Sequence, residues 1–495
     1  MAKLITPFIA QEHPLTAAEP QTGNRYQPDW SRFSHHSPPY EFPPEGNLIG
    51  DVARFIMRFA YRIVPEIALA AAMAFVAGIV GRNYNVSNTG LNLYLLFVGP
   101  SGVGKDNGVS AMQALLHSAA HVNGGMPNDP IFDFIGPEQY GSSQGLIKDL
   151  AKHPVKVAPM GEFGLTLERM VGPNAKPTEK ELKQKYLSLY SKSGKDQFFS
   201  GYGLASKDNS VERFPAPALT IFGEGTPEKI NEHVLSRENL KDGFVSRLTI
   251  VQFEGEIPYR NKNRDTLVPT ALAERINFVA RAVLMHTQQF RCYDVPFASD
   301  DVRENSEAFD DHCVDMKNAN NDDGAKELWT RTALKSLKLA ALLAVSDDTI
   351  SPVITLAHIE WAKRFELFGV ESTLRRLEDG EAGEVNEDAR VKAIVKYIKR
   401  YVMSSWPEIA KVAGEGNSHL HREYIVTYTY LHRSVANLKP FKEVRYGSPA
   451  NALKDALKIL TERGELSELS KAVMAKDHEY YGVAFAIRKP GAFGI

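Results

Sequence analysis

The chain has few cysteines, no long apolar run and no strong net charge, and each lack makes a class of protein less expected. Cys292 and Cys313 are its two cysteines, too few for a disulfide framework and in keeping with a reducing cytoplasm. No basic segment followed by an apolar stretch opens the sequence, so we expect no secretory signal. The longest apolar run, residues 67–80, is too short to span a bilayer and predicts a buried helix.

A strong net charge is lacking as well. The formal charge is −2 over 495 residues, which by itself indicates no particular partner. A composition of 43% hydrophobic and 24% charged residues is typical of a globular protein. A chain of this length exceeds one ordinary core, so we expect two or three domains.

Segments without apolar periodicity divide the chain. Residues 1–45 contain eight prolines and predict an extended N-terminal arm, either disordered or packed on a neighbouring subunit. Residues 46–90 predict a helical segment that is largely buried. The acidic, glycine-containing stretch 379–388 predicts a linker to a C-terminal domain.

Strands and helices alternate in residues 91–265, which predicts a mostly parallel sheet with helices on both faces. Residues 266–378 predict a helical subdomain. The predicted strands of the sheet are 91–98, 155–159, 218–222 and 248–253.

The sequence "GPSGVGKD" connects the first of these strands to a predicted helix over residues 109–120. A strand, a glycine-rich loop and a helix in this order are the setting of a phosphate-binding P-loop. The glycines let backbone amides turn toward phosphate oxygens, and Lys105 supplies a charge for the β- and γ-phosphates of ATP. The alternative is a turn that only links strand to helix. The predicted nucleotide-binding residues are Gly99, Pro100, Ser101, Gly102, Val103, Gly104, Lys105, Asp106 and Asn107.

Asp106 stands where a serine or threonine hydroxyl usually ligates Mg²⁺. A carboxylate is a strong magnesium ligand, but it also brings negative charge close to the triphosphate. Lys105 and the metal can offset that charge. We therefore predict that Asp106 ligates Mg²⁺.

Three further residues at strand ends complete the predicted ATPase site. Glu162 ends the strand in "VKVAPMGEFG" and is expected to hold Mg²⁺ through a water and to polarise the attacking water; the alternative is a solvated glutamate in a turn. Thr226 follows "ALTIFGEG" and is expected to sense the γ-phosphate. Arg247 directly precedes "LTIV" and is expected to reach the γ-phosphate of a neighbouring subunit; the alternative is a structural ion pair.

The C-terminal residues 389–495 carry 18 Lys and Arg against 10 Asp and Glu, a net charge of +8. Helices followed by a β-hairpin, with positive charge throughout, are typical of a winged helix-turn-helix domain. The predicted helices are 389–404, 406–413, 421–437 and 449–463, and the predicted strands are 466–469 and 481–488. The expected fold class is therefore α/β, with a P-loop NTPase core of the RecA or AAA+ type, flanking helical segments and a C-terminal winged-helix domain.

Two basic segments are candidates for DNA contact. In residues 190–210, Lys192, Lys195 and Lys207 alternate with aromatic residues and glycines, a composition that suits a loop gripping single-stranded DNA. The alternative for this segment is a solvated β-hairpin. In the C-terminal domain, the predicted recognition helix carries Lys454, Lys458 and Arg463, although winged helices also serve as protein-docking modules.

Six blocks follow one another along the chain: "ALAAAMAFVAGIVGRNYNV", "NLYLLFVGPSGVGKD", "APMGEFG", "PALTIFGEGTPEKI", "DGFVSRLTIV" and "RTALKSLKLAALLAVSDD". In this order they resemble the blocks of phage and prophage P-loop ATPases that are described as replicative helicases or as the helicase half of primase-helicases. The resemblance covers about residues 46–378. It implies a hexameric, ATP-driven ring that acts on DNA in the cytoplasm of a bacterial host during phage or mobile-element replication. It places Lys105 and Asp106 at the Walker A site, Glu162 at the Walker B acid and Arg247 at an arginine acting across subunits. The chain departs from the family in Asp106 and in having an arm instead of an N-terminal primase domain.

Two hypotheses follow. The first is a Mg²⁺-dependent ATPase that assembles as a ring and unwinds or translocates on DNA, with a primase or other replication proteins as further partners. The second is a DNA-binding initiator or helicase loader that uses nucleotide mainly for assembly. A packaging or defence ATPase would need a nuclease domain, and no acidic cluster in the sequence indicates one.

Overall fold

The structure is a computed structural model. It describes residues 41–122, 124–125, 127–171, 175–201, 210–235, 240, 242–320, 322–378, 387–442 and 446–489. The predicted arm lies outside these residues except for 41–45, and the predicted linker lies outside them except for 387–388.

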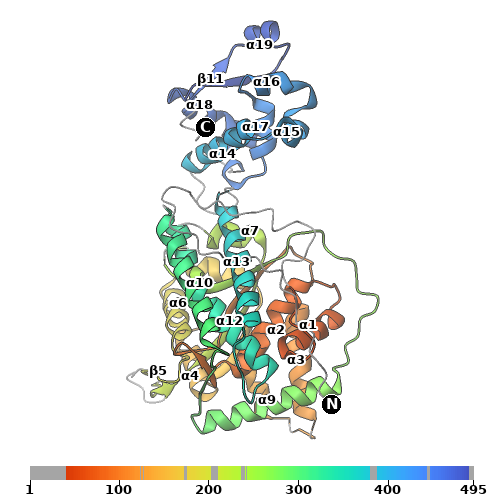
Figure 1. The fold of residues 1–495 in the computed structure, drawn as a ribbon, viewed down its shortest axis with the longest axis vertical. Coiled ribbons are helices and arrows are strands. Elements are labelled where there is room, and N and C mark those ends of the chain that lie inside the picture. The colour runs from red at the N-terminus through yellow and green to blue at the C-terminus, as the bar shows by residue number, and fades with distance from the viewer. Residues whose placement is uncertain are drawn as a thin grey trace. The chain divides into compact units, whose positions relative to one another are not determined.

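A parallel sheet of four strands lies in the first part of the described chain, as the alternating pattern predicted. In Figure 1, helices of this part, among them α12 (Thr332–Asp347) and α13 (Leu356–Glu378), lie in front of much of the sheet. Its strand order is β4 (Val155–Met160), β7 (Ala218–Gly225), β3 (Tyr94–Val98) and β8 (Leu248–Gln252), and every neighbouring pair is parallel. All residues of these strands are buried, which explains why they read as continuous apolar runs.

Helices cover both faces of this sheet, so side chains of β3 alternate between two cores. Leu95 and Phe97 belong to the core that includes α1 (Leu48–Phe59), α2 (Pro65–Val80) and α3 (Asp106–His121). Tyr94, Leu96 and Val98 belong to the core on the other face. That second core includes α4 (Ser143–Lys152), α5 (Phe163–Val171) and α6 (Pro177–Tyr190).

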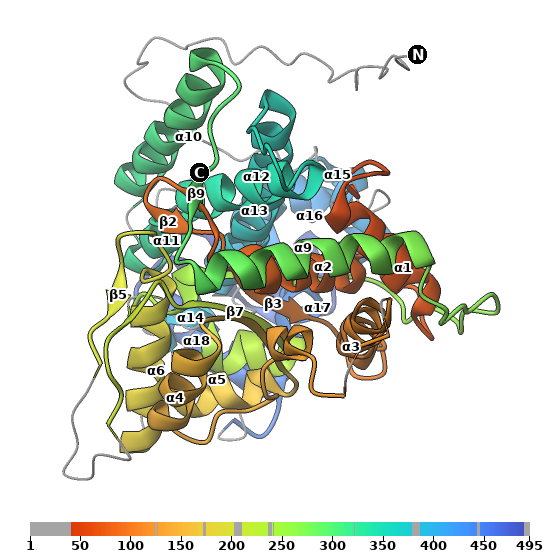
Figure 2. The same ribbon diagram turned by 90° about the horizontal axis from the view of Figure 1, so that it is seen from below.

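The alanine-rich run is a buried helix, as its composition predicted. Every residue of α2 except Pro65 is buried, and a Cβ added at Gly78 would come within 2.6 Å of the Val157 Cβ. Small side chains therefore allow α2 to approach the sheet closely. α9 (Thr270–Gln288) runs alongside α2 (Figure 2).

The predicted helical subdomain is helical in the structure. It contains α9, α10 (Asp300–Ala319), α11 (Asp323–Trp329), α12 (Thr332–Asp347) and α13 (Leu356–Glu378). α12 packs against α13, and a buried ion pair joins Lys335 Nζ to Glu366 Oε2 at 3.0 Å. Shorter elements complete this part of the chain: β1 (Tyr84–Val86), β2 (Thr89–Gly90), η2 (Pro130–Phe134), β5 (Phe198–Phe199), β6 (Phe214–Pro215), α7 (Pro227–Lys229), η4 (Ile230–Val234), η5 (Val245–Arg247) and β9 (Tyr293–Asp294).

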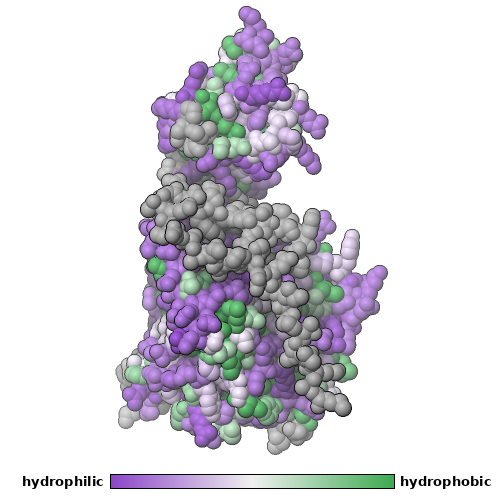
Figure 3. All heavy atoms as spheres, viewed as in Figure 1, coloured by the Kyte–Doolittle hydropathy of each residue, from purple (hydrophilic) through white to green (hydrophobic). Residues whose placement is uncertain are grey.

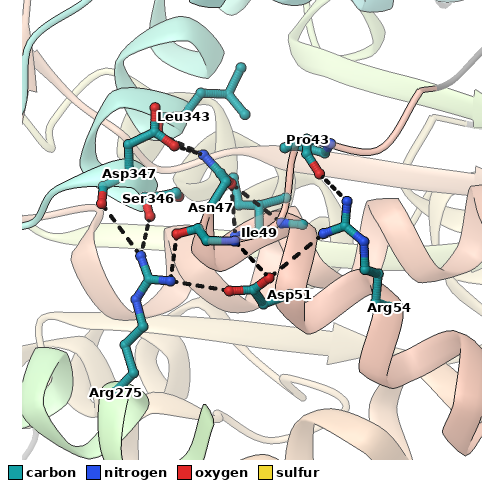
Figure 4. A network of polar contacts seen from close by, with 11 residues as sticks. Pro43, Asn47, Ile49, Asp51, Arg54, Arg275, Leu343, Ser346 and Asp347 are labelled. Atoms are coloured by element: carbon teal, nitrogen blue, oxygen red, sulfur yellow. Dashed lines mark hydrogen bonds and ion pairs between the residues drawn. The ribbon is translucent and has the colours of Figure 1, made fainter. Parts of the chain in front are cut away.

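A polar network at the start of α1 ties this helix to α9 and α12 (Figure 4). Asn47 caps α1 by accepting from the Ile49 and Gly50 amides at 3.1 and 3.3 Å. Its Nδ2 donates to the Leu343 carbonyl at 3.1 Å and to Asp347 Oδ1 at 2.7 Å. Arg275 of α9 donates to the Gly46 and Ser346 carbonyls, both at 2.6 Å.

Asn47→Ala should lower the free energy of unfolding by about 3 kcal/mol, because it removes a helix cap and leaves the buried Leu343 carbonyl without this donor. Asn47 is 2% exposed, so water cannot replace its bonds without rearrangement. Urea unfolding followed by tryptophan fluorescence measures the change. The exposed Asn263→Ala is the control, and equal midpoints for the two variants would contradict the role given to this network.

The C-terminal residues 387–489 form their own hydrophobic cores. An antiparallel sheet has the order β10 (Ile425–Thr427), β12 (Ala484–Ile487), β11 (Leu466–Leu469). The helical elements are α14 (Glu387–Met403), α15 (Trp406–Ala413), η6 (Glu415–Asn417), α16 (Ser418–Arg422), α17 (Tyr428–Val435), η7 (Lys439–Phe441), α18 (Pro449–Glu462) and α19 (Lys471–Asp477).

The prediction of one helix over 421–437 was wrong, because β10 interrupts it. The run "IVT" is β-branched and pairs with Ala484–Ala486 of β12, a partner that local sequence does not reveal. The prediction of a simple turn between the last two strands was also wrong, because α19 lies there.

In the described part of the chain, no helix is both long and apolar enough to cross a membrane. The face drawn in Figure 3 is mostly hydrophilic over the described residues, with hydrophobic side chains in small separate groups.

Candidate functional site

The glycine-rich loop leaves β3 at the edge of the sheet where β7 and β8 also end. The Gly99 amide donates to the Gly225 carbonyl at 3.1 Å, just after β3 and β7 end. The Phe253 amide donates to the Val98 carbonyl at 2.9 Å, just after β8 ends. Ligands of parallel α/β sheets bind outside the carboxyl ends of the strands, which is where this loop lies.

Two glycines of the loop adopt backbone conformations that other residues rarely take. Gly102 has φ +81° and Gly104 has φ +91°. A Cβ at Gly104 would also come within 2.5 Å of the Asn107 Nδ2. Both positions therefore favour glycine for the dihedral angle, and an added Cβ at Gly104 would also displace the Asn107 amide group.

Lys105 and Asn107 hold the loop at the start of α3. The Lys105 ammonium donates to the Gly99 carbonyl at 3.3 Å, so the amine folds back across the loop. The Asn107 Nδ2 donates to the Gly104 carbonyl at 2.6 Å, and its Oδ1 accepts from the Tyr61 amide at 3.2 Å. Asp106 is exposed in the first turn of α3. The positive end of a 16-residue helix, the loop amides and one lysine thus meet in one place, an arrangement suited to phosphate.

Glu162 lies in the tight turn between β4 and α5. Its φ of +52° is left-handed, which costs a residue with a side chain roughly 1–2 kcal/mol. Its carbonyl accepts from the Leu165 amide at 2.9 Å in the first turn of α5, and the residue is exposed. The turn thus presents a carboxylate to solvent at the carboxyl end of the sheet.

Glu224 is the acid that sequence reasoning passed over in favour of Thr226. It lies near the end of β7 opposite Phe97 of β3 and is 5% exposed, and its Oε1 has no hydrogen-bond partner among the residues that the structure describes. Burial raises the pKa of Glu224 to about 7; the charges of Asp106 and Glu162 also raise it, and Lys105 lowers it. Three of the residues predicted from sequence therefore lie within electrostatic reach of this buried carboxyl.

Thr226 follows β7 and precedes α7, where its side chain makes no capping hydrogen bond. The signal that could have identified Glu224 is a single acidic residue inside the apolar run "ALTIFGEG". An ionisable group in a buried strand needs a partner or a function.

The donor set fits Mg²⁺ bound through phosphate. In the described residues, no three His, Cys, Asp or Glu side chains gather into a metal cage. Mg²⁺ is usually held by one or two carboxylates together with phosphates and waters. Asp106, Glu162 and the orphaned Glu224 Oε1 could supply such carboxylates beside the loop.

Arg247 lies at the opposite edge of the sheet. It directly precedes Leu248, which pairs with Tyr94 at the start of β3, whereas the glycine loop follows the end of β3. Five strand residues, about 17 Å, separate the two edges. Arg247 is therefore not brought together with Lys105 of its own chain.

Basic groups surround one aromatic ring at this opposite edge. The Arg247 and Arg331 guanidinium carbons both lie 5.9 Å from the Tyr190 ring centroid, and Lys338 Nζ lies 4.4 Å from it. Arg247 also donates to the Gly243 carbonyl. Burial lowers the pKa of Arg247, and the charge of Arg331 lowers it further. Among its described contacts Arg247 has no ion pair. If its role is structural, it therefore acts through its contact with the Tyr190 ring and not through the ion pair considered from the sequence.

The segment predicted to grip DNA, residues 190–210, contains β5, which pairs in antiparallel fashion with β6 just beyond the segment. Lys195 forms an ion pair with Asp294, and its amide donates to Asn85 Oδ1 at 2.8 Å. Lys192 is partly buried at the end of α6. Lys207 lies outside the described residues.

The three basic residues predicted on the C-terminal recognition helix are all exposed. Lys454 and Lys458 lie on α18, Arg463 follows its last residue, and Lys458 is 3.8 Å from Glu462. The opposite face of α18 is buried through Leu453, Leu457 and other apolar residues. The helix thus offers cations on the face that is not packed in the core.

No protein-family model matches this chain, and no curated protein matches it.

Proposed function

We propose that the protein binds ATP with Mg²⁺ at residues 99–107 and hydrolyses it. The observation that carries this proposal is the glycine-rich loop with its lysine, at the carboxyl edge of a parallel sheet, beside the buried Glu224. In this proposal Lys105 binds the phosphates and Asp106 ligates Mg²⁺. Glu162 or Glu224 orients the attacking water, and Thr226 senses the γ-phosphate. Mg²⁺ supplies charge stabilisation for the leaving phosphate when bound.

The strand order supports a P-loop NTPase core of the RecA or AAA+ type. The strand ending near Glu224 lies next to β3, and the strand followed by Glu162 lies one further away. The position of Arg247 at the far edge supports a role toward a neighbouring subunit, because it cannot reach its own nucleotide loop. Such a role requires a neighbouring copy of the chain, and the family resemblance makes a homo-hexameric ring the assembly that we propose.

We further propose that ATP hydrolysis drives a helicase or translocase acting on DNA in phage or mobile-element replication, in the host cytoplasm and in concert with a primase or other replication proteins. The C-terminal part supports DNA contact. Its order of α14, α15, α16, β10, α17, α18, β11, α19 and β12 contains the helices and the strand pair of a winged helix, and α18 exposes Lys454 and Lys458. Arg213, which directly precedes β6 and lies over the Phe198 ring, suits contact with a single strand.

The rate of ATP hydrolysis with and without single-stranded DNA tests this function. A translocase should hydrolyse ATP severalfold faster when DNA is present, because DNA binding and turnover are coupled in each cycle. A slow rate that DNA leaves unchanged, with nucleotide-dependent assembly, would instead favour the initiator or loader.

Substitution of Asp106 tests the metal ligand. If the carboxylate ligates Mg²⁺, Asp106→Ser should keep or raise the ATPase rate, while Asp106→Ala should lower it about tenfold or more. Rates measured over a range of Mg²⁺ concentrations should show the alanine variant needing more metal. Equal behaviour of the wild type and both variants would show that Asp106 is only a neighbour of the site.

A further inference from the structure

Two segments remote from the glycine loop in sequence converge beside it. The first is the connection between α1 and α2. Its Tyr61 amide donates to Asn107 Oδ1 at 3.2 Å, two residues beyond Lys105. The Cβ of its Arg62 lies 3.7 Å from the place where a Cβ on Gly104 would stand. The α1–α2 connection therefore forms a wall of the nucleotide loop.

The second segment is the connection from β8 to α9, residues 253–269. It begins at the same edge of the sheet as the loop and joins the first segment through an antiparallel bridge between Arg62 and Arg260. The Asn261 amide donates to the Tyr61 carbonyl at 2.7 Å, and Arg62 donates to the Pro258 carbonyl. These bonds fix the second segment to the first.

Each segment presents an exposed tyrosine next to a member of the bridge. Tyr61 is 48% exposed and precedes Arg62; Tyr259 is 95% exposed and precedes Arg260. The Arg62 guanidinium lies over the Tyr61 ring, with its central carbon 5.6 Å from the ring centroid. Single exposed aromatic residues are ordinary, but two on bonded segments at the edge of one site offer a stacking surface.

We infer that Tyr61 and Tyr259 form the subsite for the base of the bound nucleotide, a planar heteroaromatic ring such as adenine. This inference rests on the proposed function and extends it from the phosphates to the base. Stacking requires a flat aromatic or guanidinium face at a fixed place beside the phosphate site, and both tyrosine-bearing segments are held there by backbone hydrogen bonds.

Attachment to the loop favours a nucleotide base over a base of single-stranded DNA. The amide of Tyr61 bonds directly to a side chain in the first turn of α3, so the backbone that carries the ring keeps a fixed relation to the phosphate-binding amides. One ligand that carries both a triphosphate and a base uses both features at once. A DNA strand has no need of that fixed relation.

Calorimetric titration of the full chain with ATP and, separately, with inorganic tripolyphosphate, both in Mg²⁺, tests the subsite. Tyr61→Ala and Tyr259→Ala should each weaken ATP binding about tenfold and leave tripolyphosphate binding unchanged. Truncation of Tyr61 keeps the amide that bonds to Asn107, so the loop should retain its anchor. Tyr61→Phe and Tyr259→Phe should bind ATP as the wild type does, because stacking needs only the ring.

Tyr481→Ala, which removes an 83% exposed tyrosine from the C-terminal part, is the matched control and should not change ATP affinity. Equal binding of ATP and tripolyphosphate by the wild type would overturn the base subsite and leave the proposed function standing. ATP affinity unchanged in the alanine variants, or a loss shared equally by both ligands, would also overturn it. Titration with an oligothymidine strand separates the two kinds of base. Alanine variants that lose affinity for this strand but not for ATP would also overturn the base subsite. If the wild type binds neither ligand, the proposed function fails and the subsite fails with it.

Discussion

Lys105→Ala should lower the rate of ATP hydrolysis by about 100-fold or more, the largest effect we expect from a single substitution. The lysine is the one cation that the glycine loop itself holds across its backbone, through the Gly99 carbonyl. Removing it takes away a charge placed where the phosphates would lie. Steady-state phosphate release, measured on purified full-length protein, reports the loss.

Lys152→Ala is the matched control, because it removes an exposed lysine from the last turn of α4. It should hydrolyse ATP at the wild-type rate. Lys105→Ala should also unfold near the wild-type midpoint, since its ammonium makes only one long hydrogen bond in the described structure. Wild-type turnover in Lys105→Ala would remove the glycine loop as the hydrolysis site.

Glu224→Gln should have two effects that separate stability from turnover. Its folded-state pKa of about 7 lies above the ordinary 4.5 because the carboxyl is buried beside Asp106 and Glu162. Between these two values the folded protein holds a proton that the unfolded chain releases. The wild-type free energy of unfolding should therefore fall as pH rises from 4.5 to about 7, by up to about 3 kcal/mol, with the full penalty present above pH 7.

Glutamine carries no charge at any pH, so Glu224→Gln should lose this dependence and be the more stable protein above pH 7. If Glu224 orients the water or the metal, the same variant should hydrolyse ATP about 100-fold more slowly. Urea midpoints at pH 5 and pH 8, with phosphate release at pH 8, test both effects. The difference in urea midpoint between Glu224→Gln and the wild type should be larger at pH 8 than at pH 5. An equal difference at the two pH values would contradict the burial of this charge.

Local sequence patterns predicted many of the strands and helices that form the core. The four central strands were expected close to where they lie, because fully buried parallel strands read as short apolar runs between helices. The glycine loop and the buried helix over residues 67–80 were also identified, since each depends on residue types within one short segment.

Features that depend on distant partners could not be predicted. The local sequence marks Glu224 as an acid within an apolar run, but its place beside the glycine loop arises because β7 pairs with β3, more than a hundred residues away, and no local pattern reveals that pairing. The contact of Tyr61 with Asn107 joins two segments whose sequences carry no mark of each other. The local sequence predicts a helix over β10, because the partner that makes it a strand, β12, comes near the end of the described chain.

The place of β3 between β7 and β8 has a consequence for how the protein is made. Both neighbours of this strand, and so the edge that holds the glycine loop, come from residues up to Gln252. At about 5–20 residues per second, a ribosome adds the roughly 150 residues after Lys105 in about 7–30 seconds. During that time the glycine loop of the nascent chain has no complete sheet beside it. Nucleotide binding therefore cannot stabilise the earliest folded states. Nucleotide binding thus requires the completed core, so binding of nucleotide indicates that β8 has paired with β3.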